Sequence, residues 1–181
     1  MRLTQNCDEK QTAAIEALYV EAFPKDERKP FQLILEKCRE GAAELLAIED
    51  EMGSFMGMAV TVLYQDLVLL DYFAIAAGQR GNGIGTEIFK LLRKKYEGKR
   101  FFLEIERTDV EAENIVQRKK RKEFYLRNGM KETGLLVWLF GVEMEVLTDS
   151  CRISYEEYYG LYKGVFGTER MGKNIRLIAS E

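Results

Sequence analysis

The feature that most constrains this 181-residue chain is a short glycine-rich loop between two apolar patterns. An apolar run at residues 67–75 leads into the loop, in which Gly81, Gly83 and Gly85 occupy alternate positions. Residues 84–96 then space their apolar side chains at helical intervals. A strand that leads through glycines into a helix offers unpaired backbone N–H groups at the positive end of the helix dipole. Because glycines also allow close backbone approach, the layout predicts a site for a phosphate group.

Three classes of phosphate-binding loop compete for this segment. A P-loop needs lysine and then serine or threonine after its last glycine, but Gly85 is followed by Thr86 and no lysine. A dinucleotide-binding loop would use Gly81 and Gly83, but Thr86 stands at its third glycine position. That fold also needs several strand-helix-strand units, and the chain has one convincing unit. The third class, an acyl-CoA loop, fits best.

The sequence Gln79-Arg80-Gly81-Asn82-Gly83-Ile84-Gly85 has the form R-x-x-G-x-G preceded by glutamine. It resembles the acyl-CoA pyrophosphate loop of the GNAT acetyltransferases. In that family an apolar triplet at the end of the preceding strand pairs its backbone with the pantetheine arm. The resemblance implies acetyl-CoA as the acyl donor. It assigns the following residues to the acetyl-CoA site: Phe73, Ala74, Ile75, Gln79, Arg80, Gly81, Asn82, Gly83, Ile84, Gly85 and Thr86.

Composition narrows the possible chemistry. The chain has no histidine, which excludes Ser-His-Asp and Cys-His catalysis and the usual zinc sites. A net charge of −3 gives no overall basic field for nucleic acid. No apolar stretch approaches the roughly 20 residues that cross a bilayer, and the N-terminus lacks the apolar part of a signal peptide. Three separated cysteines without metal-motif spacing favour a reduced, cytoplasmic protein. We therefore expect no metal, nucleic acid or membrane partner.

Hydrophobic periodicity predicts the element order β-α-α-β-β-β-α-β-α-β-β. This is the GNAT order, so the resemblance implies a mixed α/β fold of the α+β type, with a mostly antiparallel central sheet flanked by helices. It covers residues 1–148, most specifically 67–130. Residues 149–181 form a C-terminal helical extension, in which Ser154 and Glu157 make a capping box. We expect the extension to pack on the same domain or on a dimer partner.

The resemblance also implies an enzyme, an N-acetyltransferase that moves acetyl from acetyl-CoA to a primary amine. The amine would attack directly in a ternary complex. Tyr125 lies in the segment 124–130, which resembles the family segment whose tyrosine precedes a glycine and an apolar residue. It is thereby assigned as the proton donor to the CoA sulfur, a role that a phenol protonated at neutral pH can fill. A strand amide near residues 73–75 is expected to stabilise the oxyanion.

The first candidate for the general base is Asp71. It is the only charge inside an apolar strand, where an unpaired carboxylate is costly and a raised pKa would suit proton abstraction. Neighbouring N–H groups or an arginine could equally satisfy it. Glu106, with Glu104 on the same strand face, is a reserve candidate, and water is another. Asn114 resembles the family asparagine that contacts the cofactor arm, although residues 107–113 make the preceding link longer than usual.

The sequence indicates less about the amine acceptor than about the acyl donor. A small-molecule or peptide amine is expected, and acidic residues between the two early helices, such as Glu21, Asp26 and Glu27, could attract a cation. The basic run 117–122 is interpreted as a solvated helix face. The protein is expected to be a monomer or a homodimer. Two rival functions are a non-catalytic acyl-CoA-binding sensor or interaction module on the same fold, and a dinucleotide-dependent oxidoreductase.

Overall fold

The chain divides into two compact units, which are described separately below. The computed structural model describes residues 1–5, 7–25, 27–81, 83–149 and 151–180. The first unit comprises Met1–Leu63 and Leu70–Gly98, and the second comprises Tyr64–Leu69 and Lys99–Glu181.

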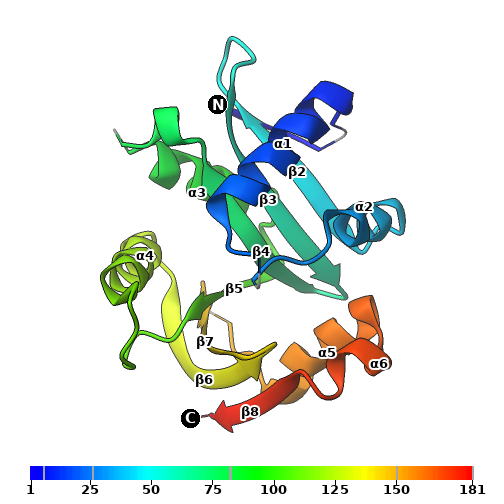
Figure 1. Cartoon of the computed structure of the whole chain (residues 1–181), viewed down its shortest axis with the longest axis vertical. Helices are drawn as coiled ribbons and strands as arrows, with labels where there is room; N and C mark the ends of the chain where they lie inside the picture. The colour runs from blue at the N-terminus through cyan, green and yellow to red at the C-terminus, as the bar shows by residue number, and fades with distance from the viewer. Residues whose placement is uncertain (6, 26, 82, 150, 181) are drawn as a thin grey trace. The chain divides into compact units, whose positions relative to one another are not determined.

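The first unit contains a sheet with helices on both faces (Figure 1). Its strands run in the order β1-β2-β3-β4, and β2 pairs antiparallel with both β1 and β3. The tip between β3 and β4 belongs to the second unit. The elements in chain order are β1 (Arg2–Thr4), α1 (Glu9–Ala22), α2 (Phe31–Arg39), β2 (Ala43–Glu49), β3 (Phe55–Tyr64), β4 (Leu67–Ile75), the 3-10 turn η1 (Ala77–Gln79) and α3 (Ile84–Lys95).

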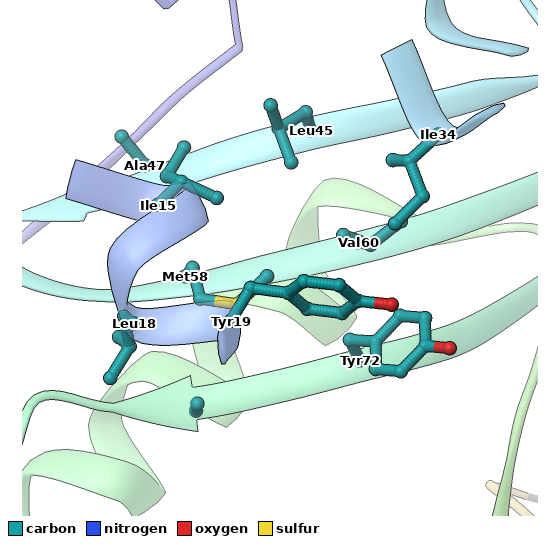
Figure 2. Packing of buried hydrophobic residues seen from close by; sticks show 10 residues of the cluster. Ile15, Leu18, Tyr19, Ile34, Leu45, Ala47, Met58, Val60 and Tyr72 are labelled. Carbon is teal, nitrogen blue, oxygen red and sulfur yellow. The ribbon is translucent and has the colours of Figure 1, made fainter. Parts of the chain in front are cut away.

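Helices α1 and α2 bury their apolar side chains against one face of β2, β3 and β4 (Figure 2). Tyr19 of α1 and Tyr72 of β4 meet edge to face, with ring centroids 4.8 Å apart. Side chains alternate across a strand, so Phe73 points to the opposite face from Tyr72. There it lies 6.3 Å from the ring of Phe89 in α3. The first unit is therefore a sheet between two helical layers.

The start of α1 is fixed by the residues that precede it in the sequence. The Asp8 side chain accepts from the Gln11 N–H at 2.7 Å, and the Gln11 side chain accepts from the Asp8 N–H at 3.0 Å. This reciprocal capping box satisfies two N–H groups that the first helical turn leaves unpaired.

The second unit contains antiparallel strands in the order β5-β7-β6-β8. The pairings of both units confirm the predicted mixed α/β fold with mostly antiparallel strands. The elements of the second unit are β5 (Arg100–Glu106), α4 (Ile115–Arg127), β6 (Lys131–Leu139), β7 (Val142–Thr148), α5 (Tyr155–Phe166), α6 (Thr168–Met171) and β8 (Ile175–Ala179).

The extension after β7 is more than the predicted helix. The capping box of Ser154 and Glu157 is present at the start of α5. Along α5 the rings of Tyr158, Tyr162 and Phe166 follow one another, and all three side chains are buried. Beyond α5 the chain adds α6 and then β8, which pairs with β6 (Figure 1).

Candidate functional site

The glycine loop adopts the strand, turn and helix layout expected from the sequence. After β4 the chain makes the turn η1 and then passes through Gly81 (φ 104°) and Gly83 (φ 77°), the N-cap of α3. These positive φ values favour glycine. A Cβ atom added to either glycine would meet no described atom within 4 Å. The glycines therefore set the backbone conformation and leave its outer side open; Asn82 lies outside the described residues.

Helix α3 presents backbone amides at this open side. The Ile84 N–H donates to the Gly81 carbonyl at 3.2 Å, and the Glu87 N–H donates to the Gly83 carbonyl at 3.1 Å. Between them, the N–H groups of Gly85 and Thr86 have no backbone acceptor among the described residues. Amides at a helix N-terminus that lack a backbone acceptor can bind an anion. This arrangement fits a pyrophosphate, so the residues present suit an acyl-CoA.

The end of β4 is tied directly to the loop. Arg80 donates from Nε to the Ile75 carbonyl at 3.1 Å, and the Gln79 N–H donates to the Ala76 carbonyl at 2.9 Å. Phe73 and Ile75 are half-buried, whereas Ala74 between them is buried. The strand end and the loop are thus connected by hydrogen bonds within the first unit. They include the apolar triplet, Gln79, Arg80 and the other described loop residues.

Asp71 on β4 is paired with a lysine that the sequence analysis did not single out. The Lys29 Nζ atom donates to Asp71 Oδ1 at 2.7 Å and to Oδ2 at 2.9 Å. The Asp71 side chain is only 5% exposed and that of Lys29 only 16%. The lysine thus supplies the compensation that a carboxylate in an apolar strand requires. This agrees with the alternative that a partner satisfies Asp71, with lysine in place of arginine.

The backbone of Lys29 is also held in place. Its carbonyl accepts from the Tyr19 hydroxyl at 3.0 Å, and its N–H donates to the Tyr72 hydroxyl at 3.0 Å. Tyr72 in turn donates to the Glu27 carbonyl at 3.0 Å. Burial, followed by the neighbouring Tyr72 and Asp71, raises the pKa of Tyr19, so this phenol stays a neutral hydrogen-bond donor. Two tyrosines from α1 and β4 therefore fix the segment that leads into α2.

Glu106 and Asn114 meet in an ion-pair network of the second unit. The Asn114 Nδ2 atom donates to Glu106 Oε1 at 3.0 Å, and its Oδ1 accepts from Arg118 Nε at 2.6 Å. Arg118 and Arg121 both pair with the buried Glu106 carboxylate. Asn114, Arg118 and Arg121 are spaced so that they share one face of a helix, which is the sequence signal for this cluster. These contacts favour a structural role for Glu106 and Asn114.

A second buried carboxylate also binds α4. Lys122 pairs with Glu145 Oε2 at 2.5 Å, while Glu145 Oε1 accepts from the Thr108 N–H and hydroxyl, both at 2.6 Å. Burial alone would raise the pKa of Glu145, but Lys122 and Thr108 lower it below its usual range. The interpretation of residues 117–122 as a solvated face was therefore wrong for Arg118 and Lys122, whose side chains are only 17% and 20% exposed, whereas Arg121 pairs with Glu106 and remains 44% exposed.

Tyr125 stands in a Schellman motif at the end of α4. The Met130 N–H donates to the Tyr125 carbonyl at 3.0 Å, the Gly129 N–H donates to the Leu126 carbonyl at 3.0 Å, and Gly129 has φ 89°. This 6→1 and 5→2 pattern ends a helix at a glycine. Burial raises the pKa of Tyr125 to about 12, although Arg121 opposes the shift. The pattern of tyrosine, glycine and apolar residue is thus also a helix stop.

The expectations of no metal site and no membrane partner can be compared with the residues that the structure describes. These residues include no group of three or more His, Cys, Asp or Glu side chains placed to hold a metal ion. Within the same ranges, none of the helices combines the length and apolar character that a membrane crossing requires.

Solved structures with the same fold are numerous, and three are informative. A GNAT-family protein from Bacteroides thetaiotaomicron superposes with a TM-score of 0.75 at 20% identity, covering 92% of this chain and 99% of that chain. The spermidine N-acetyltransferase of Vibrio cholerae, in complex with CoA and spermine, has a TM-score of 0.62 at 13% identity, with coverages of 81% and 93%. The aminoglycoside 6'-N-acetyltransferase of Enterococcus faecium has a TM-score of 0.61 at 16% identity, with coverages of 85% and 100%.

Sequence comparison gives the family. No curated protein sequence matches the chain. The family model described as "Acetyltransferase (GNAT) family" matches residues 11–129, about two thirds of the chain. This match includes the glycine loop, whose geometry suits acetyl-CoA as the acyl donor. The chain therefore belongs to the GNAT acetyltransferase family and is an acyltransferase.

Proposed function

We propose that the protein transfers the acetyl group of acetyl-CoA to the primary amine of a small molecule, by direct attack in a ternary complex. The observation that carries the proposal is the glycine loop at the end of β4, where the Gly85 and Thr86 amides at the start of α3 have no backbone acceptor among the described residues. In this proposal these amides bind the pyrophosphate, and the backbone at Phe73–Ile75 holds the pantetheine arm. Holding both reactants in register can supply about 7–11 kcal/mol of the barrier reduction.

Tyr125 is proposed to assist departure of the sulfur. Its pKa of about 12 keeps the phenol protonated, so it can donate a hydrogen bond throughout the physiological range. Thiols titrate near 8.5, so complete proton transfer from such a phenol to a thiolate is unfavourable by roughly 5 kcal/mol. We therefore assign Tyr125 as a hydrogen-bond donor that stabilises developing negative charge on sulfur, with solvent as the final source of the proton.

The base is proposed to be Asp71 or water. Both Asp71 oxygens face the Lys29 ammonium, so an incoming amine must share or displace that contact before Asp71 can accept its proton. Glu106 is the weaker candidate, because Arg118, Arg121 and Asn114 already engage its carboxylate.

A polyamine or an aminoglycoside is the proposed acceptor class. The comparison structures include enzymes that are named for spermidine and for the 6' amine of aminoglycosides. Both kinds of acceptor are small polycations. At the candidate site, the Asp71 carboxylate and the Tyr72 ring already surround one ammonium group, that of Lys29.

The test is titration with acetyl-CoA, followed by a thiol-release assay over spermidine, an aminoglycoside and a lysine-containing peptide. We expect saturable acetyl-CoA binding and amine-dependent thiol release with one of the small polycations. Release with the peptide alone would replace the acceptor class. Binding without turnover on any amine would favour the sensor function. Binding of NAD with no response to CoA would overturn the proposal as a whole.

A further inference from the structure

Both the backbone and the side-chain amine of Lys29 are held in place by contacts with neighbouring residues. Hydrogen bonds to Tyr19 and Tyr72 fix its backbone. Its ammonium contacts both oxygens of Asp71 and lies 5.2 Å from the centroid of the Tyr72 ring. A carboxylate and an aromatic face are the groups that recognise an ammonium ion. The chain therefore places one of its own amines in an ammonium-binding environment.

That environment belongs to the strand on which the acyl donor is proposed to lie. Asp71 and Phe73 point to the same side of β4, because side chains alternate along a strand. Two strand residues span about 7 Å, so the amine-binding carboxylate lies close to the first residue of the proposed pantetheine contact. Lys29, Asp71, Tyr72 and the glycine loop all belong to the first unit.

We propose that Lys29 is an internal acyl acceptor, so that the protein acetylates its own Lys29 side chain. This inference rests on the proposed function, because acetyl-CoA is the donor. The Lys29 ammonium first gives one proton to the Asp71 carboxylate. The neutral Nζ then forms a bond to the thioester carbonyl carbon, and the carbon–sulfur bond breaks. The products are Nζ-acetyl-lysine and CoA thiol, with one proton released in total, because an ammonium becomes an amide.

Tethering is the physical reason for selectivity among the lysines. A lysine in free solution must find the thioester by collision, whereas a positioned amine reacts with a high effective concentration. Lys25 lies in the same segment but its side chain is exposed, and Lys37 on α2 pairs with Glu40 at 2.8 Å. Acetylation also removes the positive charge of Lys29, which would leave the Asp71 carboxylate without this cation.

The experiment incubates the full chain with isotopically labelled acetyl-CoA and no added amine. Peptide mass spectrometry then follows the label at each lysine with time. We expect one acetyl group per chain, at Lys29, appearing at least about tenfold faster than at Lys25 or Lys37. Asp71→Asn is expected to slow the labelling of Lys29. Lys29→Arg keeps the ion pair, and it is expected to leave no other lysine labelled at the fast rate.

Two controls make the result decisive. Gly83→Asp, designed to block acetyl-CoA binding, must abolish fast labelling, because equal labelling in this variant would mean uncatalysed acetylation and would overturn the proposal. Acetyl-CoA binding and amine-dependent thiol release are measured on the same preparation. If both occur while Lys29 stays unlabelled, self-acetylation is refuted and the proposed function stands. If acetyl-CoA does not bind, both fall together.

Discussion

At the residue scale, Tyr125 combines a structural task with a proposed chemical one. Its carbonyl accepts the Met130 N–H in the motif that ends α4. The backbone fills this role with any side chain, whereas the proposed chemical role needs the phenol. Since the ring is buried, a change to phenylalanine preserves most of the packing. The two tasks can therefore be separated by a single substitution.

Tyr125→Phe is expected to lower turnover by about tenfold or more, because it removes the proposed hydrogen-bond donor to the departing sulfur. The acetyl-CoA dissociation constant should be unchanged. Steady-state kinetics and a binding titration measure the two quantities. Tyr159→Phe in α5 is the matched control and should retain turnover. Unchanged turnover in Tyr125→Phe would remove this residue from the mechanism.

At the element scale, helix α4 is held by ionic contacts more than by an apolar stripe. Tyr125 is its buried apolar residue, while Arg118, Arg121 and Lys122 reach the buried Glu106 and Glu145. Removing one partner from a buried pair leaves an uncompensated charge, which is costly. The stability of this helix on its strands should therefore depend on pH.

Glu145→Gln is expected to lower the free energy of unfolding by about 2 kcal/mol at neutral pH, because Lys122 loses its buried partner and keeps only the exposed Glu132. The pKa of Glu145 is depressed in the fold, so its contribution is present above the unfolded pKa near 4.3 and is lost as the pH falls through the folded value. Denaturant unfolding from pH 7 to pH 3 should show the variant and wild type converging.

Glu143→Gln on the same strand is the control for that series. Glu143 pairs with Arg107 but its side chain is 43% exposed, so its loss should cost less than about 1 kcal/mol. A constant difference between Glu145→Gln and wild type at every pH would show that the charge of Glu145 is not what holds α4.

Helix α5 contains two glycines, Gly160 and Gly164, whose replacement by alanine should have opposite effects on stability. A Cβ atom on Gly164 would stand 2.3 Å from the Tyr64 ring, whereas one on Gly160 would meet nothing within 4 Å. Gly164→Ala should cost about 1–3 kcal/mol through overpacking. Gly160→Ala should stabilise by up to about 1 kcal/mol, since alanine favours helix. Thermal or denaturant unfolding compares them, and equal effects would contradict the close packing of Gly164.

At the scale of the whole molecule, ligand binding and folding are linked. A ligand that binds only the folded chain stabilises it by about 2.7 kcal/mol at one hundred times its dissociation constant. The proposed acyl-CoA site includes Gly83, whose φ of 77° disfavours other residues. The melting temperature in the presence of acetyl-CoA therefore reports directly on the loop.

Gly83→Asp is expected to abolish the rise in melting temperature that acetyl-CoA gives the wild type, because its carboxylate repels a phosphate at the helix start. Gly98→Asp is the control, since Gly98 also has positive φ (83°) with no described atom near its added Cβ. It should lower stability without acetyl-CoA by a similar amount but keep the ligand-induced rise. Loss of the rise in both variants would mean that the effect is not local.

Features that depend on residues close together in the sequence could be predicted, whereas features that depend on contacts between distant residues could not. The glycine loop and the capping box of α5 are encoded within a few residues, so they were predicted. The Lys29–Asp71 pair joins residues 42 positions apart, and no local pattern marks it. Strand β8 depends on pairing with β6, and α4 begins at Ile115 only after a turn in which Arg107 pairs with Asp109.

The last strand bears on where the chain can be shortened. Ile175 and Leu177 pair with Leu139 and Val137, so β8 occupies the outer side of β6. A chain ending at residue 148 would leave the backbone N–H and C=O groups on that side open to a strand from another molecule. Removing the tail of this acyltransferase should therefore yield a protein that self-associates through β6, even with the glycine loop intact.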